Sequence, residues 1–173
     1  MPYYTYFNYY KPDTDGCDSL IDCQTGARTD AYYWAQEVNN EIHSFEKTYL
    51  NFKWEGVMYL DAGMTTQQLA LLETCMTSHE RLTNIRSNKD VVVGVFSDKD
   101  GANGRTDGFM VMNYSDPYYA NKGAKDNVVL IFDNATHALV YKDGKQYIAT
   151  LTDGKLSAYL GAGEGMFVVP YIG

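Results

Sequence analysis

Acidic residues are numerous in this chain, and some of them are spaced in a way that could support catalysis. Glu37 and Glu41 are four residues apart, which places two side chains next to each other on a helix. A carboxylate pair can supply the acid and the base of a hydrolytic reaction. These two share the polar face of a predicted helix, however, where solvated acids are ordinary. Glu164 stands between two glycines and is expected in a turn, so we assign no catalytic residue.

The other residues that could react or bind a metal are scattered along the chain. The three histidines form no HxxxH or HExxH pair. The three cysteines form no CxxC motif, although a bridge between Cys17 and Cys23 is left open. Acidic loops at residues 13–18 and 98–107 lack the spacing of a calcium loop, so we expect solvated turns there, Asp107 included. The sequence predicts no metal and no cofactor.

The overall charge limits which partners the chain can bind. Fourteen basic residues stand against 22 acidic ones, which gives a net charge of -8. Such a surface repels nucleic-acid phosphates and anionic lipids. No apolar run reaches the roughly 18 residues of a membrane helix, and no export signal is recognisable. We therefore expect neither a nucleic-acid nor a membrane partner, and the sequence leaves the compartment unknown.

One segment carries a helical pattern of apolar residues. It covers residues 29–49, and Thr29 or Asp30 can cap its N-terminus by accepting backbone N–H bonds. The apolar stripe consists of Trp34, Val38, Ile42, Phe45 and Tyr49. Ahead of it, residues 2–10 are expected to form a strand that runs into a loop. Because an apolar stripe must be covered, we expect the whole helix to dock on the segments that follow it.

From residue 51 onward the pattern changes to short β-type runs separated by turn residues. The ten runs are residues 56–60, 69–72, 82–85, 91–97, 109–114, 128–132, 137–141, 146–151, 156–160 and 166–169. Asp143-Gly144 and Asp153-Gly154 fit two-residue hairpin turns, from which we expect the last four strands to form an antiparallel meander. The sequence thus predicts a mainly β fold, an antiparallel β-sandwich of immunoglobulin-like or jelly-roll-like type with one N-terminal α-helix packed on it.

Five segments of the chain suggest a family. Residues 3–12 read YYTYFNYYKP, and residues 27–57 contain the predicted helix. Residues 107–117, 135–141 and 163–170 read DGFMVMNYSDP, ATHALVY and GEGMFVVP. Together they resemble the C-terminal part of bacterial β-galactosidase-like glycoside hydrolases with a (β/α)8 barrel, similar to family 42. The first two segments look like the last barrel strand and helix, and the other three like the β-sandwich that follows the barrel.

The resemblance implies two parts and no catalytic centre. Residues 1–50 would be the remnant of the last βα unit of a TIM barrel, and residues 51–173 the C-terminal β-sandwich domain. Enzymes of this kind use two carboxylates about 5 Å apart, which in the family lie on the fourth and seventh strands, upstream of Met1. We therefore expect a non-catalytic accessory module, with the rest of the parent barrel as its partner. It would stabilise the barrel, assist oligomerisation through the parent enzyme, or help to bind substrate.

Aromatic residues are the feature that most suggests a ligand. Tyr6, Tyr9 and Tyr10 would lie near the carboxyl end of the barrel strand that the resemblance implies, where they could wall a sugar subsite. Their alternative role is to fill the core of the barrel. A second hypothesis is a stand-alone carbohydrate-binding module, and a third is an interaction or adhesion domain of unknown partner. The aromatic platform of such a module would draw on Trp54, Tyr59, Tyr118 and Tyr119.

Overall fold

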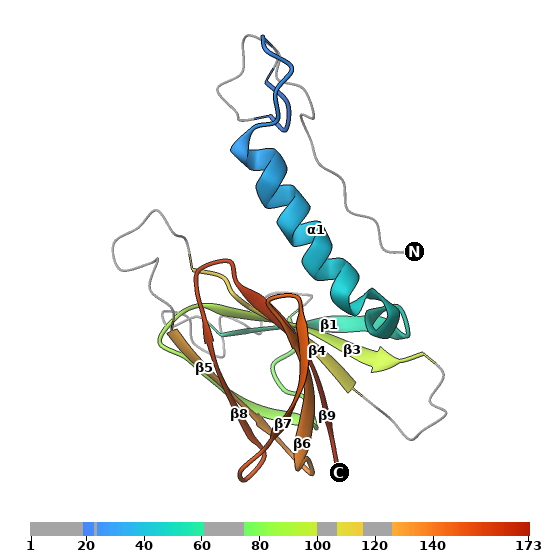
Figure 1. Ribbon diagram of the computed structural model, residues 1–173. Coiled ribbons are helices and arrows are strands. Elements are labelled where there is room, and N and C mark those ends of the chain that lie inside the picture. Colours follow the sequence, from blue (N-terminus) through green and yellow to red (C-terminus); the bar gives the residue numbers. More distant parts are fainter. Residues whose placement is uncertain (1–18, 23, 61–74, 100–106, 116–125) are drawn as a thin grey trace. The chain divides into compact units, whose positions relative to one another are not determined.

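The computed structural model describes residues 19–22, 24–60, 75–99, 107–115 and 126–173. Within these ranges it contains one helix and nine strands (Figure 1). The elements are α1 (Asp30–Tyr49), β1 (Phe52–Leu60), β2 (Leu82–Arg86), β3 (Val91–Asp98), β4 (Asp107–Asn113), β5 (Asp126–Phe132), β6 (His137–Lys142), β7 (Lys145–Thr150), β8 (Lys155–Leu160) and β9 (Gly165–Tyr171). The chain divides into two compact units, Met1–His43 and Ser44–Gly173, and the boundary falls inside α1.

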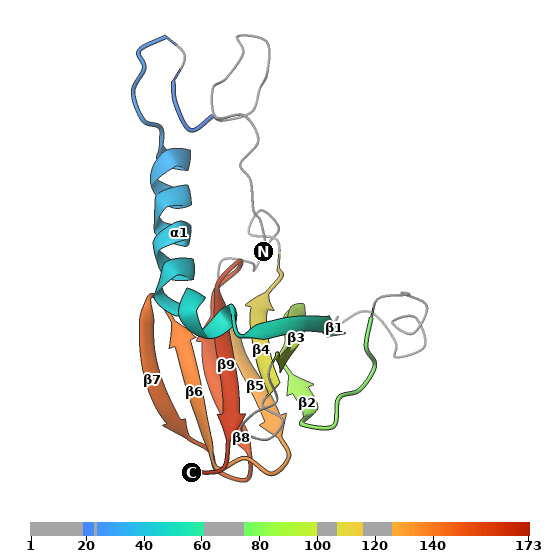
Figure 2. The ribbon, with the colours of Figure 1, turned by 90° about the vertical axis from the view of Figure 1, so that its right-hand side faces the viewer.

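The strands form two antiparallel sheets. The larger sheet has the order β1-β3-β4-β9-β6-β7, and the smaller sheet has the order β2-β5-β8. Figure 2 shows the larger sheet from β7 on the left to β1 on the right. The predicted fold class, a mainly β antiparallel sandwich with one helix, is confirmed. Nine of the ten predicted runs are strands, and the remaining run, residues 69–72, lies outside the described residues.

The two sheets enclose a common apolar core because inward and outward residues alternate along each strand. In β3 of the larger sheet, Val91, Val93 and Val95 are buried, and in β5 of the smaller sheet, Val128 and Leu130 are buried. All five belong to one hydrophobic cluster. Burying each such side chain contributes roughly 1.5–3 kcal/mol, so this core supplies most of the drive for the sandwich to form.

The helix begins where the sequence indicates, but Thr29 does not cap it in the expected way. The Thr29 hydroxyl has one hydrogen, which it donates to the Ser19 carbonyl oxygen, with the Leu20 carbonyl oxygen 3.2 Å away as a second acceptor, instead of accepting a bond from the helix. The Thr29 carbonyl accepts the Tyr32 N–H at 3.1 Å. The hydroxyl therefore ties the preceding loop to the start of α1, because a loop carbonyl competes for the same side chain.

The predicted meander of the last four strands is wrong. Asp143 and Gly144 have φ values of 52° and 67° and join β6 to β7 as the expected two-residue hairpin. Asp153 and Gly154 have φ values of 51° and 69°, but their turn closes only an isolated bridge. After it the chain joins the other sheet, where β8 pairs with β5, and β9 returns between β4 and β6. Apolar alternation is the same in either sheet, so it does not indicate which sheet a strand joins.

The turn before β8 approaches the smaller sheet closely at Gly154. The Gly154 carbonyl accepts the Phe132 N–H at 2.9 Å, and a Cβ at Gly154 would collide with the Phe132 carbonyl oxygen. Gly144 has a similar positive φ, but nothing lies within 4 Å of the place where its Cβ would be. Gly154 is therefore required for two reasons, backbone conformation and space, and Gly144 for only one.

These two glycines give a matched test of the turn through which the chain passes from the larger sheet to β8 of the smaller one. Gly144→Ala should lower the free energy of unfolding by about 1 kcal/mol, the strain of a left-handed alanine. Gly154→Ala should cost at least about 3 kcal/mol, because the backbone of β5 must also move. Urea denaturation of both variants measures the difference. Equal losses would show that the approach of Gly154 to Phe132 is unimportant.

Candidate functional site

An aromatic cluster joins the end of α1 to the larger sheet. It lies on the outer face, which is the face of this sheet away from the core. Phe45 stacks on Phe167 at 5.8 Å with 14° between the rings, and Tyr49 meets Phe96 and Phe167 edge-on at 5.3 and 5.9 Å. The cluster comprises Phe45, Tyr49, Phe52, Phe96, Tyr141 and Phe167. Offset and edge-to-face ring pairs are worth about 0.5–1.5 kcal/mol beyond the area that they bury.

One hydrogen bond holds the aromatic cluster together, and one glycine leaves the space that it needs. The hydroxyls of Thr48 and Tyr141 lie 2.8 Å apart, which ties the last turn of α1 to β6. A Cβ at Gly108 would lie 2.7 Å from Cζ of Phe167, so only glycine leaves room for that ring on the neighbouring strand. Phe167 is completely buried as a result. The end of the helix and the sheet thus form one packed body.

The expected burial of the whole helical stripe is wrong at its N-terminal positions. Phe45 is 9% exposed, but Trp34 is 63% and Val38 is 50% exposed. Apolar residues recur at the helical period along the whole stripe. This period does not indicate how much of the helix another part of the protein covers. Trp34 and Val38 of the stripe are therefore left in contact with solvent.

Among the residues predicted to bind carbohydrate, the structure describes Trp54. It lies on β1, opposite Phe96, beside a bulge between Trp54 and Gly56, and it is 57% exposed. Tyr59, farther along the same strand, is half-buried and meets Tyr114 edge-on at 6.3 Å. The other predicted residues, Tyr6, Tyr9, Tyr10, Tyr118 and Tyr119, lie outside the described residues. Trp54 and Tyr59 share one sheet face, and neither of them lines the hollow described below.

The expectation that Asp107 lies in a solvated turn is wrong. Asp107 is the first residue of β4, is completely buried, and has its Oδ2 3.6 Å from Nε of Arg81. Arg81 directly precedes β2, so this ion pair links the larger sheet to the smaller one. A buried carboxylate needs such a partner because the desolvation of a lone charge is costly. Asp107 therefore has a structural role that its acidic loop sequence conceals.

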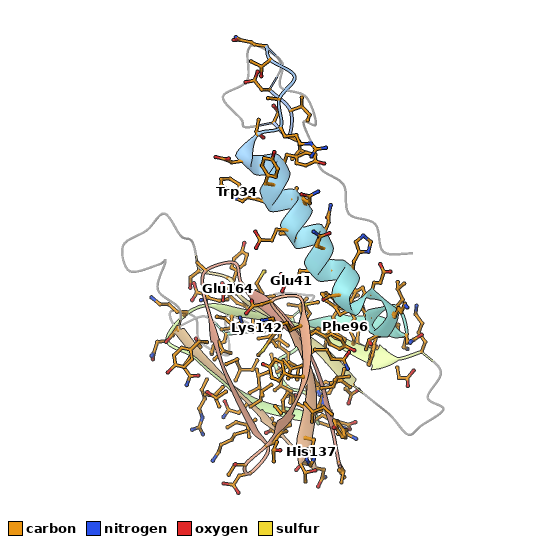
Figure 3. All side chains as sticks on the ribbon, in the orientation of Figure 1. Trp34, Glu41, Phe96, His137, Lys142 and Glu164 are labelled. Atoms are coloured by element: carbon orange, nitrogen blue, oxygen red, sulfur yellow. The ribbon has the colours of Figure 1, made fainter. Side chains whose placement is uncertain are left out.

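Glu164 also has a structural environment. Its Oε2 accepts the Gly161 N–H at 2.9 Å and lies 3.5 Å from Nζ of Lys142. Figure 3 shows Lys142 and Glu164 close together at one end of the sandwich. Nζ of Lys142 lies 2.8 Å from Oδ2 of Asp143 as well. Burial lowers the pKa of Lys142, but the carboxylates of Asp143 and Glu164 more than offset it, so this pKa lies above its ordinary value.

A hollow lies beside the smaller sheet, and sequence reasoning missed it. It has a volume of about 390 Å³ and is lined by Leu60, Ile85, Arg86, Ser87, Asn88, Asn127 and Val129. These residues come from the end of β1, from β2 and the turn after it, and from β5. The signal in the sequence was the alternation within β5, where Asn127 and Val129 face away from the buried Val128 and Leu130.

The described residues contain no group of three or more His, Cys, Asp or Glu side chains that could bind a metal ion. Cys75 is a free, half-buried thiol, and the Cys17–Cys23 bridge that the sequence leaves open lies outside the described residues. In the part of the chain that the structure covers, no helix is long and apolar enough to cross a membrane. Comparisons with protein-family models, with curated proteins and with solved structures find no match for this chain.

The ion pair between the sheets can be tested by removing one partner. Arg81→Met leaves the Asp107 carboxylate buried without its cation and should lower the free energy of unfolding by about 3 kcal/mol. The double variant Arg81→Met, Asp107→Leu should recover much of this loss. Arg86→Met, at an exposed arginine five residues away, is the control and should cost less than about 0.5 kcal/mol. Additive losses in a double-mutant cycle would contradict the pairing.

The raised pKa of Lys142 predicts an effect in alkaline solution. A pKa that is higher in the folded state stabilises the fold below the unfolded pKa and ceases to do so as the pH rises through the folded pKa. Lys142→Met should therefore cost about 1 kcal/mol at pH 8, and the difference from the unmodified protein should shrink above about pH 10.5. Denaturation at several pH values measures this, with Lys155→Met as the exposed control. A difference that stays constant to the highest pH would contradict the coupling.

Proposed function

We propose that this chain is a non-catalytic accessory module of a glycoside hydrolase, in which α1 fastens the β-sandwich to the catalytic barrel. The aromatic cluster carries the proposal. A helix that only led into a separate domain would need no such contact, whereas here Phe45 and Tyr49 pack firmly against Phe96 and Phe167. A helix of 20 residues whose last turn is packed on the sandwich would link the sandwich to a partner.

The exposed side chains of α1 indicate where that partner would dock. Tyr33, Trp34 and Val38 are each at least half exposed and lie within two helical turns. Large apolar side chains that gather on one element commonly mark an interaction surface. In the proposed enzyme, neighbouring helices of the barrel would cover these residues, because α1 would be the last helix of the barrel ring.

The acids of the sandwich support a structural module as well. Asp107 pairs with Arg81, and Glu164 binds the Gly161 N–H and Lys142. Each of these carboxylates holds one part of the fold to another. In the proposal, the two carboxylates that cleave the glycosidic bond belong to the barrel.

A direct test uses the coding sequence immediately upstream of this segment. The polypeptide that includes it should hydrolyse a chromogenic galactoside, and the 173-residue chain should not. Hydrolysis by the chain alone would overturn the proposal, because it would place the catalytic acids here. An upstream reading frame without alternating strand and helix patterns would overturn it equally, because no barrel would then be encoded.

Two positions of the helical stripe test the docking of α1. In the 173-residue chain, Phe45→Ala should lower the free energy of unfolding by about 3–4 kcal/mol, since it leaves a cavity. Trp34→Ser should change it by less than about 0.5 kcal/mol, since Trp34 is exposed. In the longer polypeptide, Trp34→Ser should become destabilising by about 2 kcal/mol or more, because the barrel would bury this side chain. A neutral Trp34→Ser in both proteins would argue against docking through this face.

A further inference from the structure

The outer face of the smaller sheet combines apolar, amide and aromatic side chains. Side chains alternate along β5. Val128 and Leu130 are completely buried in the core, so Asn127 and Val129 face outward. Asn127 lies directly opposite Tyr159 of β8, which is 65% exposed. Residues that are directly opposite in antiparallel strands share a face, with Cβ atoms about 5 Å apart. Tyr159 therefore stands next to the hollow that Asn127 lines.

The lining of the hollow combines apolar and polar side chains, and two of the apolar ones, Leu60 and Ile85, also pack against the core. Leu60, Ile85 and Val129 supply apolar surface, and Arg86 and Asn88 supply exposed hydrogen-bonding groups. No ion pair of Arg86 is found among the described residues, so its guanidinium can donate to a ligand. The hollow thus offers hydrogen-bond donors beside apolar surface, and the exposed Tyr159 ring lies opposite Asn127, one of its lining residues.

A hydrogen bond within the face orients the Asn127 amide. The Ser157 hydroxyl donates to Oδ1 of Asn127 at 2.5 Å. Because Oδ1 is the acceptor of this bond, the NH2 group of Asn127 is the part of the amide that can donate to a ligand. The amide is held in place by its neighbour on β8, which lowers the entropy lost when it binds.

We infer that this face binds an oligosaccharide, with one sugar ring on Tyr159 and the adjacent ring in the hollow. A sugar presents a flat C–H surface that suits an aromatic ring and hydroxyls that accept hydrogen bonds from amide and guanidinium groups. Apolar ligands need deeper and mainly apolar pockets. Nucleic acids need several cations, in contrast to the net charge of -8. The inference deepens the proposed function, on which the choice of a saccharide rests.

Amide NMR shifts of the isotope-labelled full chain test the inference. The probes are short β-linked galacto-, gluco- and xylo-oligosaccharides and an oligosaccharide that contains uronic acid. At least one should shift the amides of residues 86–88, 127–129 and 157–159, with a Kd of about 1 mM. If only the acidic oligosaccharide binds, the result supports the site and assigns Arg86 to the carboxylate. If no probe shifts these amides at about 10 mM, the inference is overturned.

Matched tyrosine variants make the test specific. Tyr159→Ala should weaken binding about tenfold or more, because it removes the stacking ring. Tyr147→Ala should leave binding unchanged, since Tyr147 is a partly exposed tyrosine on β7 of the other sheet. Unchanged binding in Tyr159→Ala would overturn the inference. If Tyr159→Ala binds as well as the unmodified chain but the longer polypeptide hydrolyses galactosides, the sugar site is wrong and the proposed function is still supported. The two proposals can therefore fail separately.

Discussion

The burial of β9 on both faces is the constraint on which the rest of the structure depends. Met166 and Val168 face the core between the sheets, and Phe167 faces the aromatic cluster on the outer side. β9 also has a neighbouring strand on each side, because it lies between β4 and β6 in the larger sheet. The end of α1 covers Phe167 through Phe45 and Tyr49, so the burial of this ring depends on the docking of the helix end.

Two buried polar residues determine how the ends of the sandwich close. Asp107 and Asn113 begin and end β4, and both are completely buried. Asp107 reaches Arg81 beside the smaller sheet, and Asn113 donates from Nδ2 to the Leu160 carbonyl at 2.9 Å. Since buried polar and charged groups are costly to leave without partners, Asp107 favours the arrangement of the sheets that places Arg81 beside its carboxylate, and Asn113 favours the one that brings its amide to the Leu160 carbonyl. The apolar core supplies the drive to fold, and these polar contacts specify the register of the two layers.

The two layers separate the two proposed roles of the molecule. The outer face of the larger sheet carries the aromatic cluster and is occupied by the end of α1. The outer face of the smaller sheet carries Tyr159 and Asn127, which is one of the residues that line the hollow. Attachment and ligand binding would then use opposite faces of one sandwich. A module built in this way could be fixed to a catalytic domain without covering the surface that would hold the oligosaccharide.

The sequence by itself determined the local elements of this protein, because they depend on neighbouring residues. The helical stripe, nine strands and the hairpin at Asp143-Gly144 follow from residue periodicity and from the need for positive φ. Tertiary structure alone decided that β8 joins β5, that Asp107 is buried and that Trp34 is exposed. It also assembled the hollow, whose residues come from three strands far apart in the chain. These features depend on which surfaces meet, and a periodic pattern shows only that a surface exists, not what covers it.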